Sequence, residues 1–225
     1  MALLLNIDTA TEIAATSISE NENVIESATN NDQKDHASFL QPAIKNLLQK
    51  TNLSIDKLNA IAVTSGPGSY TGLRVGMASA KGLCYALKIP MVTINTLQVM
   101  ALSTINREKD KRAFYCPMID ARRMEVFTAV YDDDLLEIIK PCSMILEDGA
   151  FNDLLQTNRI YFSGSGSIKF KEITNNKDAL FVISEATTNA MAQLSYQNFV
   201  KKNFADVSYS SPVYLKEFYT SVPRA

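Results

Sequence analysis

Two short apolar segments of this sequence end in the same pair of residues, Ile-Asp, and the same series of predicted elements follows each. The segments are Leu3–Asp8 and Ala113–Asp120. After each, alternating apolar and polar residues predict two strands joined by a turn, then a helix, then another strand. A repeated order of elements favours a duplicated protein with two α/β lobes, in which Asp8 and Asp120 hold matching places.

The duplication sets the expected domain organisation. A charged stretch, Asn106–Arg112, separates the two series. We therefore expect residues 1–106 to form an N-terminal lobe and residues 107–203 to form a C-terminal lobe. The last stretch, residues 204–225, is apolar enough to dock back on the N-terminal lobe.

Charge and cysteine content narrow the functional classes. The formal net charge is -2, so a large nucleic-acid footprint, which needs clustered Lys and Arg, is not expected. The three cysteines contain no CxxC pair, which predicts reduced thiols rather than a disulfide framework or a zinc site. The apolar run after Met1 is too short for a signal peptide or a membrane span. Together these features predict a cytoplasmic protein with no membrane partner.

Glycines cluster between a predicted strand and a predicted helix. Four of the eight glycines fall in SGPGSYTGLRVG, Ser65–Gly76. The segment does not match the P-loop pattern, because Leu73 and Arg74 follow Gly72 where that pattern needs lysine and then serine or threonine. Its glycine spacing is one residue too long for a dinucleotide-binding loop. Gly66 and Gly68 predict a tight turn. Anion binding at the N-terminus of the following helix stays an alternative.

The helix predicted over Thr71–Lys88, with Thr71 as its N-cap, carries small residues on one face. Gly72, Gly76 and Ala80 lie four apart. Glycine inside a helix costs up to about 1 kcal/mol relative to alanine, so we expect another backbone to approach this face closely. The approaching element is either the sheet of the same chain or a helix of another subunit.

Five segments resemble the TsaB (YeaZ) family, in the family's order and spacing, and together they run through nearly the whole chain. They are NIDTATEIAATSI (Asn6–Ile18), DHASFLQPAI (Asp35–Ile44), SGPGSYTGLRVGMASAKGLCYAL (Ser65–Leu87), IDARRMEVF (Ile119–Phe127) and SPVYLK (Ser211–Lys216). The glycine-rich segment is the most specific of the five.

The resemblance implies a fold and a set of partners. The fold is the two-lobed actin/Hsp70/sugar-kinase (ASKHA) fold, an α/β fold with duplicated lobes whose central mixed sheets are flanked by helices. In bacteria the family is a non-catalytic partner of TsaD, which transfers a threonylcarbamoyl group to the tRNA adenosine next to the anticodon; TsaE, an ATPase, joins them. The resemblance thus implies that this chain binds TsaD. Without TsaD we expect the same surface to close a homodimer, because self-complementary patches are common. The acidic charge predicts that the chain meets tRNA only through the complex, and no cofactor is expected.

The resemblance also implies where TsaD binds, on the helices predicted over His36–Lys50 and Thr71–Lys88. A wide apolar stripe on the first and the small-residue face of the second suit such a surface. The alternative for each apolar residue is a place in the core of the lobe. Arg74 could pair with a carboxylate of the partner or with an anion. The expected interface residues are Phe39, Leu40, Ala43, Leu47, Gly72, Arg74, Val75, Gly76 and Ala80.

Active members of this fold hold phosphate with two hairpins of the form DxG[ST], whose glycine lets backbone N–H groups face the phosphate. Here alanine replaces the first glycine, in Asp8–Thr11, and arginine replaces the second, in Asp120–Arg123. FSGSGS, Phe162–Ser167, resembles a worn form of the glycines that bind adenosine. We interpret these segments as remnants of nucleotide loops, represented by Asp8, Thr9, Thr11, Asp120, Arg122, Gly164 and Gly166.

Metal binding and catalysis are not expected from this sequence. TsaD enzymes hold a metal with a pair of histidines, whereas this chain has a single histidine, His36, which cannot supply such a site. One enzymatic alternative is an ATP-binding ATPase or kinase-like protein with Asp8 or Asp120 at the metal. The other is a glycoprotease-like peptidase, because Asp35, His36 and Ser38 are neighbours, although the sequence has no GxSxG elbow.

Overall fold

The N-terminal half of the chain forms a mixed sheet of five strands in the order β3-β2-β1-β4-β5. The computed structural model describes residues 1–32, 35–183 and 186–216. β1 pairs antiparallel with β2, with which it forms a hairpin. It pairs parallel with β4, which the chain reaches by a crossover connection through α1. The strands are β1 (Leu3–Asp8), β2 (Ala14–Glu20), β3 (Asn23–Asn30), β4 (Ala60–Gly66) and β5 (Met91–Asn95).

The second half repeats this pairing in a second sheet, with the order β10-β9-β6-β7-β8. β6 pairs antiparallel with β7 and parallel with β9, so it corresponds to β1. The predicted duplication is therefore confirmed, and Asp8 and Asp120 end corresponding strands. The strands are β6 (Phe114–Asp120), β7 (Glu125–Tyr131), β8 (Glu137–Ile145), β9 (Ile160–Ser163) and β10 (Ala179–Val182).

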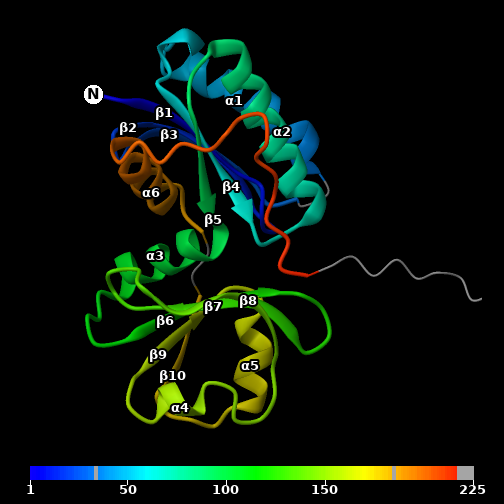
Figure 1. The fold of residues 1–225 in the computed structure, drawn as a ribbon, viewed down its shortest axis with the longest axis vertical. Helices are drawn as coiled ribbons and strands as arrows, with labels where there is room; N and C mark the ends of the chain where they lie inside the picture. Colours follow the sequence, from blue (N-terminus) through cyan, green and yellow to red (C-terminus); the bar gives the residue numbers. More distant parts are fainter. Residues whose placement is uncertain (33–34, 184–185, 217–225) are drawn as a thin grey trace, which may run out of the picture.

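Helices cover both faces of the first sheet (Figure 1). α1 (His36–Lys50) and α2 (Tyr70–Leu87) pack on one face, and the short 3-10 helix η2 (Ile55–Lys57) follows α1. α6 (Thr188–Val200) covers the other face, where its apolar residues contact β4 and β5. The predicted C-terminal lobe, residues 107–203, thus includes one helix that packs with the N-terminal lobe.

α3 (Thr96–Glu108) lies between the two lobes and belongs to the apolar core of both (Figure 1). Its Val99 packs with residues of the first sheet. Leu97 and Met100 pack with Tyr115 and Tyr131 of the second sheet, all of them buried. The lobes are therefore joined by a continuous apolar contact and not only by the chain.

The C-terminal lobe contains shorter helices than the sequence predicts. A helix is expected over Ile145–Gln156, but Ile145 belongs to β8 and α4 covers only Asn152–Leu155. Gly149 and Phe151 have positive φ, at 90° and 65°, and this left-handed backbone prevents a longer helix. Two further elements, α5 (Ser167–Ile173) and β10, are not predicted from the sequence.

The C-terminal stretch runs back along α2 (Figure 1). It begins beside β5, where Ala205 forms an antiparallel bridge with Met91. Within residues 204–216 the stretch contacts the N-terminal lobe; residues 217–225, which the predicted docking also includes, lie outside the described residues.

The three cysteines are free thiols. Burial raises the pKa of Cys84 to about 11 and that of Cys116 to about 12. Both thiols therefore stay protonated at neutral pH, as expected of core residues. Within the described ranges, no helix combines the length and the apolar character needed to cross a membrane.

Candidate functional site

The first loop that resembles a phosphate hairpin, Asp8–Thr11, is enclosed by its own lobe. The Asp8 side chain is only 6% exposed. One of its oxygens accepts hydrogen bonds from the amide of Ala10, at 3.1 Å, and from the hydroxyl of Thr64, at 2.9 Å. Burial, partly offset by these two bonds, raises the pKa of Asp8. The polar groups of this loop therefore form hydrogen bonds within their own lobe.

The glycines at the start of α2 make room for this loop. A Cβ added at Gly68 would lie 2.1 Å from the carbonyl oxygen of Ala10, and one at Gly72 would lie 2.0 Å from that of Thr9. A Cβ at Gly76 would lie 2.4 Å from the Thr9 hydroxyl oxygen. The Thr9 hydroxyl also donates to the carbonyl oxygen of Gly72 at 2.7 Å. The backbone that approaches the helix is thus the β1–β2 loop of the same chain.

Gly66 accommodates a different segment, the C-terminal stretch. Its φ is 116°, a value that residues other than glycine rarely adopt, and an added Cβ would lie 2.5 Å from the carbonyl oxygen of Val213. The amide of Val213 donates to the carbonyl oxygen of Ser65 at 2.7 Å. Each of the four glycines in the cluster is therefore in close contact with backbone or side-chain atoms of this chain.

α2 begins one residue earlier than predicted, at Tyr70, and its N-cap is Ser69. The Ser69 hydroxyl accepts a hydrogen bond from the amide of Gly72 at 3.3 Å. Thr71, the cap expected from the sequence, lies within the first turn and is exposed.

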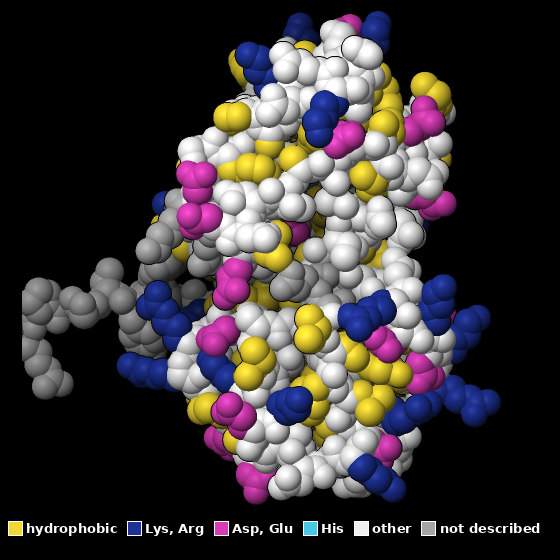
Figure 2. Space-filling view, turned by 180° about the vertical axis from the view of Figure 1, so that it is seen from behind, with side chains coloured by type: hydrophobic (Ala, Val, Ile, Leu, Met, Phe, Trp, Pro, Cys, Tyr) yellow, Lys and Arg dark blue, Asp and Glu magenta, His cyan; other side chains and the backbone are white. Residues whose placement is uncertain are grey.

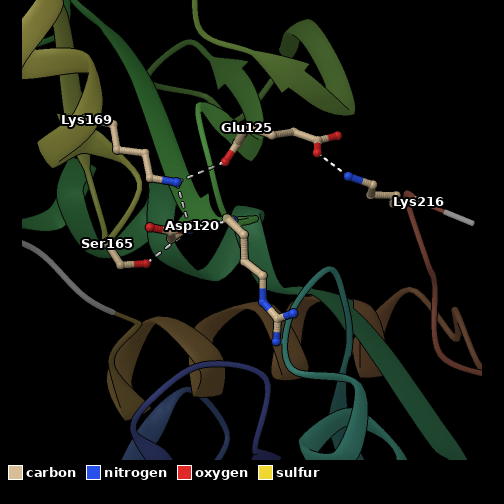
Figure 3. A network of polar contacts seen from close by, with 6 residues as sticks. Asp120, Glu125, Ser165, Lys169 and Lys216 are labelled. Carbon is tan, nitrogen blue, oxygen red and sulfur yellow. Dashed lines mark hydrogen bonds and ion pairs between the residues drawn. The ribbon is translucent and has the colours of Figure 1, made fainter. Parts of the chain in front are cut away.

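The second loop, Asp120–Arg123, is held by an ion pair (Figure 3). The Lys169 ammonium lies 2.7 Å from the Asp120 carboxylate, and the amide of Arg122 donates to the same carboxylate oxygen at 2.6 Å. Burial opposes ionisation of Asp120, but these two bonds outweigh it and lower its pKa. Arg122 and Arg123 both have positive φ, at 72° and 49°. The loop keeps a turned backbone although it lacks glycine.

The glycines of FSGSGS serve packing between elements. Gly164 has a φ of 85°, and an added Cβ would lie 2.4 Å from the Met100 methyl carbon of α3 and 2.4 Å from the carbonyl oxygen of Met118. A Cβ at Gly166 would lie 2.7 Å from Val126. Both glycines thus permit close contact with α3 and the second sheet.

Most residues expected at a partner interface lie inside the N-terminal lobe. Phe39 and Val75 are half-buried, and Arg74 is exposed. Arg74 stacks on the Tyr70 ring, 4.0 Å from its centroid, and donates to the Tyr214 hydroxyl at 3.2 Å. Internal packing, the alternative stated from the sequence, accounts for the others, which are buried: Leu40, Ala43, Leu47, Gly72, Gly76 and Ala80.

A different row of small residues, which is not part of the interface expected from the sequence, faces outward on α2. Ala78, Gly82 and Ala86 are exposed, and a Cβ added at Gly82 would have no atom within 4 Å. Their spacing of four residues is the signal that identifies them as one helix face. Beside this row, an open groove runs between α1 and η2, and Leu83 and Leu48 are among the residues that line it.

His36 is buried at the start of α1. Its Nε2 lies 3.0 Å from the carbonyl oxygen of Thr11 and must donate to it. The histidine thus fixes the end of the first loop. Among the described residues, no three His, Cys, Asp or Glu side chains are grouped as a metal site requires.

The space beside Asp8 toward α6 is small. A cavity of about 10 Å³ lies there, lined by residues that include Asn6, Thr16 and Thr187. This volume is about what one water molecule needs. The side-chain oxygen of Asn6 is buried and has no protein partner, so a water in the cavity would satisfy it.

The paired sheets and the two Asp-ended strands define a class of protein, the ASKHA proteins. A polyphosphate/ATP-glucomannokinase from Arthrobacter sp. strain KM has a similar fold, with a TM-score of 0.50 and 12% identity over 89% of this chain and 100% of that chain. At this identity the likeness concerns the fold alone. The fold class expected from the sequence is confirmed.

The chain belongs to the family described as TsaD, tRNA N6-adenosine threonylcarbamoyltransferase, whose model matches residues 23–217. Among solved structures it is similar to YeaZ from Pseudomonas aeruginosa, with a TM-score of 0.80 and 21% identity over 96% of this chain and the whole of that one.

Curated relatives carry the name "tRNA threonylcarbamoyladenosine biosynthesis protein TsaB". The chain is 33% identical to the Bacillus subtilis protein over 61% of its own length, and the match spans 59% of that relative. It is 26% identical to the Haemophilus influenzae protein over 95% of its length and 93% of the relative. The predicted resemblance to the TsaB (YeaZ) family is confirmed.

Proposed function

We propose that this chain is a non-catalytic subunit that binds a TsaD-type protein in formation of threonylcarbamoyladenosine on tRNA next to the anticodon. A TsaE-type ATPase is the further partner, and the chain forms a homodimer when TsaD is absent. The names of the relatives support the pathway. The observation that carries the non-catalytic role is that the aspartates of both loops that would hold phosphate are bonded to groups of the protein itself.

The polar groups of these loops support this role. Ala10 takes the place of a glycine, its amide bonds Asp8, and its carbonyl oxygen accepts from the amide of Ser69 at 2.7 Å. Asp120 is neutralised by Lys169. This argues against a nucleotide phosphate and its metal at these loops, because the amides of Ala10 and Arg122 and one oxygen of each aspartate already have protein partners.

The outward face of α1 and α2 is the surface we assign to TsaD. A helix of the partner can approach α2 closely only where side chains are small and exposed, which selects Ala78, Gly82 and Ala86. Phe39, Arg74 and Val75 remain proposed interface residues, since each is at least partly exposed. Gly82 is the most informative position for testing this surface, because no atom of its own chain near it would prevent a side chain there.

The surface charge supports tRNA contact only through the complex. On the face shown in Figure 2, the Lys and Arg side chains of the described residues are interspersed with Asp and Glu. Backbone phosphates of tRNA are held best by clustered cations.

The test uses Gly82→Leu, with Gln197→Leu on the exposed face of α6 as the matched control. We expect both variants to stay folded and Gly82→Leu to bind TsaD at least about tenfold more weakly, because overpacking costs about 1–3 kcal/mol. Titration calorimetry with TsaD measures affinity, and a reconstitution with TsaD, TsaE, tRNA and the threonylcarbamoyl donor measures modification.

Two results would contradict the proposal. One is undiminished tRNA modification when this chain is left out of the mixture. The other is tight ATP·Mg²⁺ binding and hydrolysis by this chain alone, both lost in Asp8→Asn, which would favour an ATPase.

A further inference from the structure

Residues 204–216, the C-terminal strap, contact both lobes. The strap starts beside β5 on the N-terminal lobe, follows α2 and ends beside β7 of the C-terminal lobe (Figure 1). α3 joins the lobes on the left of this view, and the end of the strap lies on the right. The lobes are thus attached at two separate places.

The attachment to the N-terminal lobe consists of specific polar contacts. The Lys81 ammonium donates to the carbonyl oxygens of Ser208 and Ser210, each at 3.0 Å. The amide of Val213 donates to Ser65, next to the position where Gly66 leaves room for the strap. Tyr214 contacts the ring of Tyr70, with centroids 5.3 Å apart. This part of the strap is therefore fixed over at least seven residues.

In the part of the chain that the structure describes, the strap is attached to the C-terminal lobe by an ion pair. The Lys216 ammonium contacts the Glu125 carboxylate (Figure 3). The Ser143 hydroxyl donates to the other oxygen of Glu125, which orients the carboxylate toward the strap. The hydrogen bonds from Lys216 and Ser143 lower the pKa of Glu125, so its charge persists at neutral pH. Lys169 separately contacts the carbonyl oxygen of Glu125 at 3.4 Å.

We propose that the strap is a clasp that sets the relative orientation of the two lobes, with Lys216 and Glu125 as its catch. The clasp acts on the edge away from α3, where no shared core holds the lobes in the described part of the chain. Because the catch is a partly exposed ion pair, high salt weakens it.

The test is a charge exchange in the full chain, with Lys216→Glu, Glu125→Lys and the double variant. Hydrogen exchange at the Val213 amide reports docking of the strap. Nitroxide labels at Lys57→Cys and Lys177→Cys, in a Cys142→Ser background, report the interlobe distance by pulsed electron paramagnetic resonance. Lys216→Glu changes only the exposed end of the strap, so folding of the lobes is not at risk.

Each single variant is expected to speed exchange at Val213 about two- to fivefold, the range that an exposed ion pair supports, and to broaden the interlobe distance distribution. The double variant restores both, since the pair re-forms with its charges reversed. Unchanged exchange and distances in the single variants would overturn the proposal. So would a double variant that behaves like the sum of the singles.

Discussion

The glycines of α2 are alike in sequence and opposite in surroundings. Gly72 faces the Thr9 carbonyl oxygen, whereas Gly82 faces no atom within 4 Å. We expect Gly72→Ala to lower the free energy of unfolding by roughly 1–3 kcal/mol, through overpacking against backbone. Gly82→Ala should raise it by about 0.5–1 kcal/mol, because alanine favours the helix. Urea denaturation of the two variants measures both, and a loss of stability in Gly82→Ala would contradict the assigned exposure.

At the scale of the residue, the sequence predicts which positions need a small side chain, but not which atoms lie against them. The spacing of Gly72, Gly76 and Ala80 identifies one face of a helix. It cannot say whether a sheet, a loop or another subunit lies on that face, because all three demand small side chains. Likewise, Arg74 is predicted as exposed, but its partners Tyr70 and Tyr214 depend on where the strap runs.

The start of α2 gives a test at the scale of the element. Ser69 accepts from the amide of Gly72, so Ser69→Ala should cost about 0.5–2 kcal/mol of stability. Thr71→Ala should change stability by less than about 0.5 kcal/mol, as is usual for exposed positions without such a bond. Thermal unfolding of both variants decides between the two caps. A larger loss in Thr71→Ala would restore the cap expected from the sequence.

The long elements of the N-terminal lobe are predicted closely from the sequence. The helices and the outer strand β3 show one regular face, and the central strands β1 and β4, which are buried on both faces, are continuous runs of mostly apolar residues. The C-terminal lobe is harder to predict because residues with large apolar side chains, such as Leu135 and Phe151, adopt a positive φ there. The Phe151 ring packs against the rings of Phe162 and Phe170, and this tertiary contact favours a backbone that phenylalanine otherwise avoids. Such tertiary causes leave no local pattern in the sequence.

The whole molecule should unfold in one step, because α3 contributes to the core of both lobes. Leu97 is fully buried among residues of the second sheet. We expect Leu97→Ala to cost about 2–5 kcal/mol and to shift a single calorimetric transition to lower temperature. Two separate transitions, of which only one moves, would show that the lobes are independent.

At the scale of the molecule, the two-lobed duplication follows from the order of elements, but the path of the chain between the lobes does not. The sequence of α6 does not predict that this helix packs on the first sheet. Its apolar residues would suit either sheet, and only the sheet that lacks a second covering layer needs them.

The packing of α6 on the first sheet has a consequence for the newly made chain. The face of the first sheet that includes Ala62, Val92 and Ile94 is covered by α6, which lies far downstream of β5 in the chain. At about 5–20 residues per second, the ribosome completes α6 roughly 5–20 s after β5. During that interval the nascent N-terminal lobe exposes an apolar sheet face, which is where a ribosome-associated chaperone would bind.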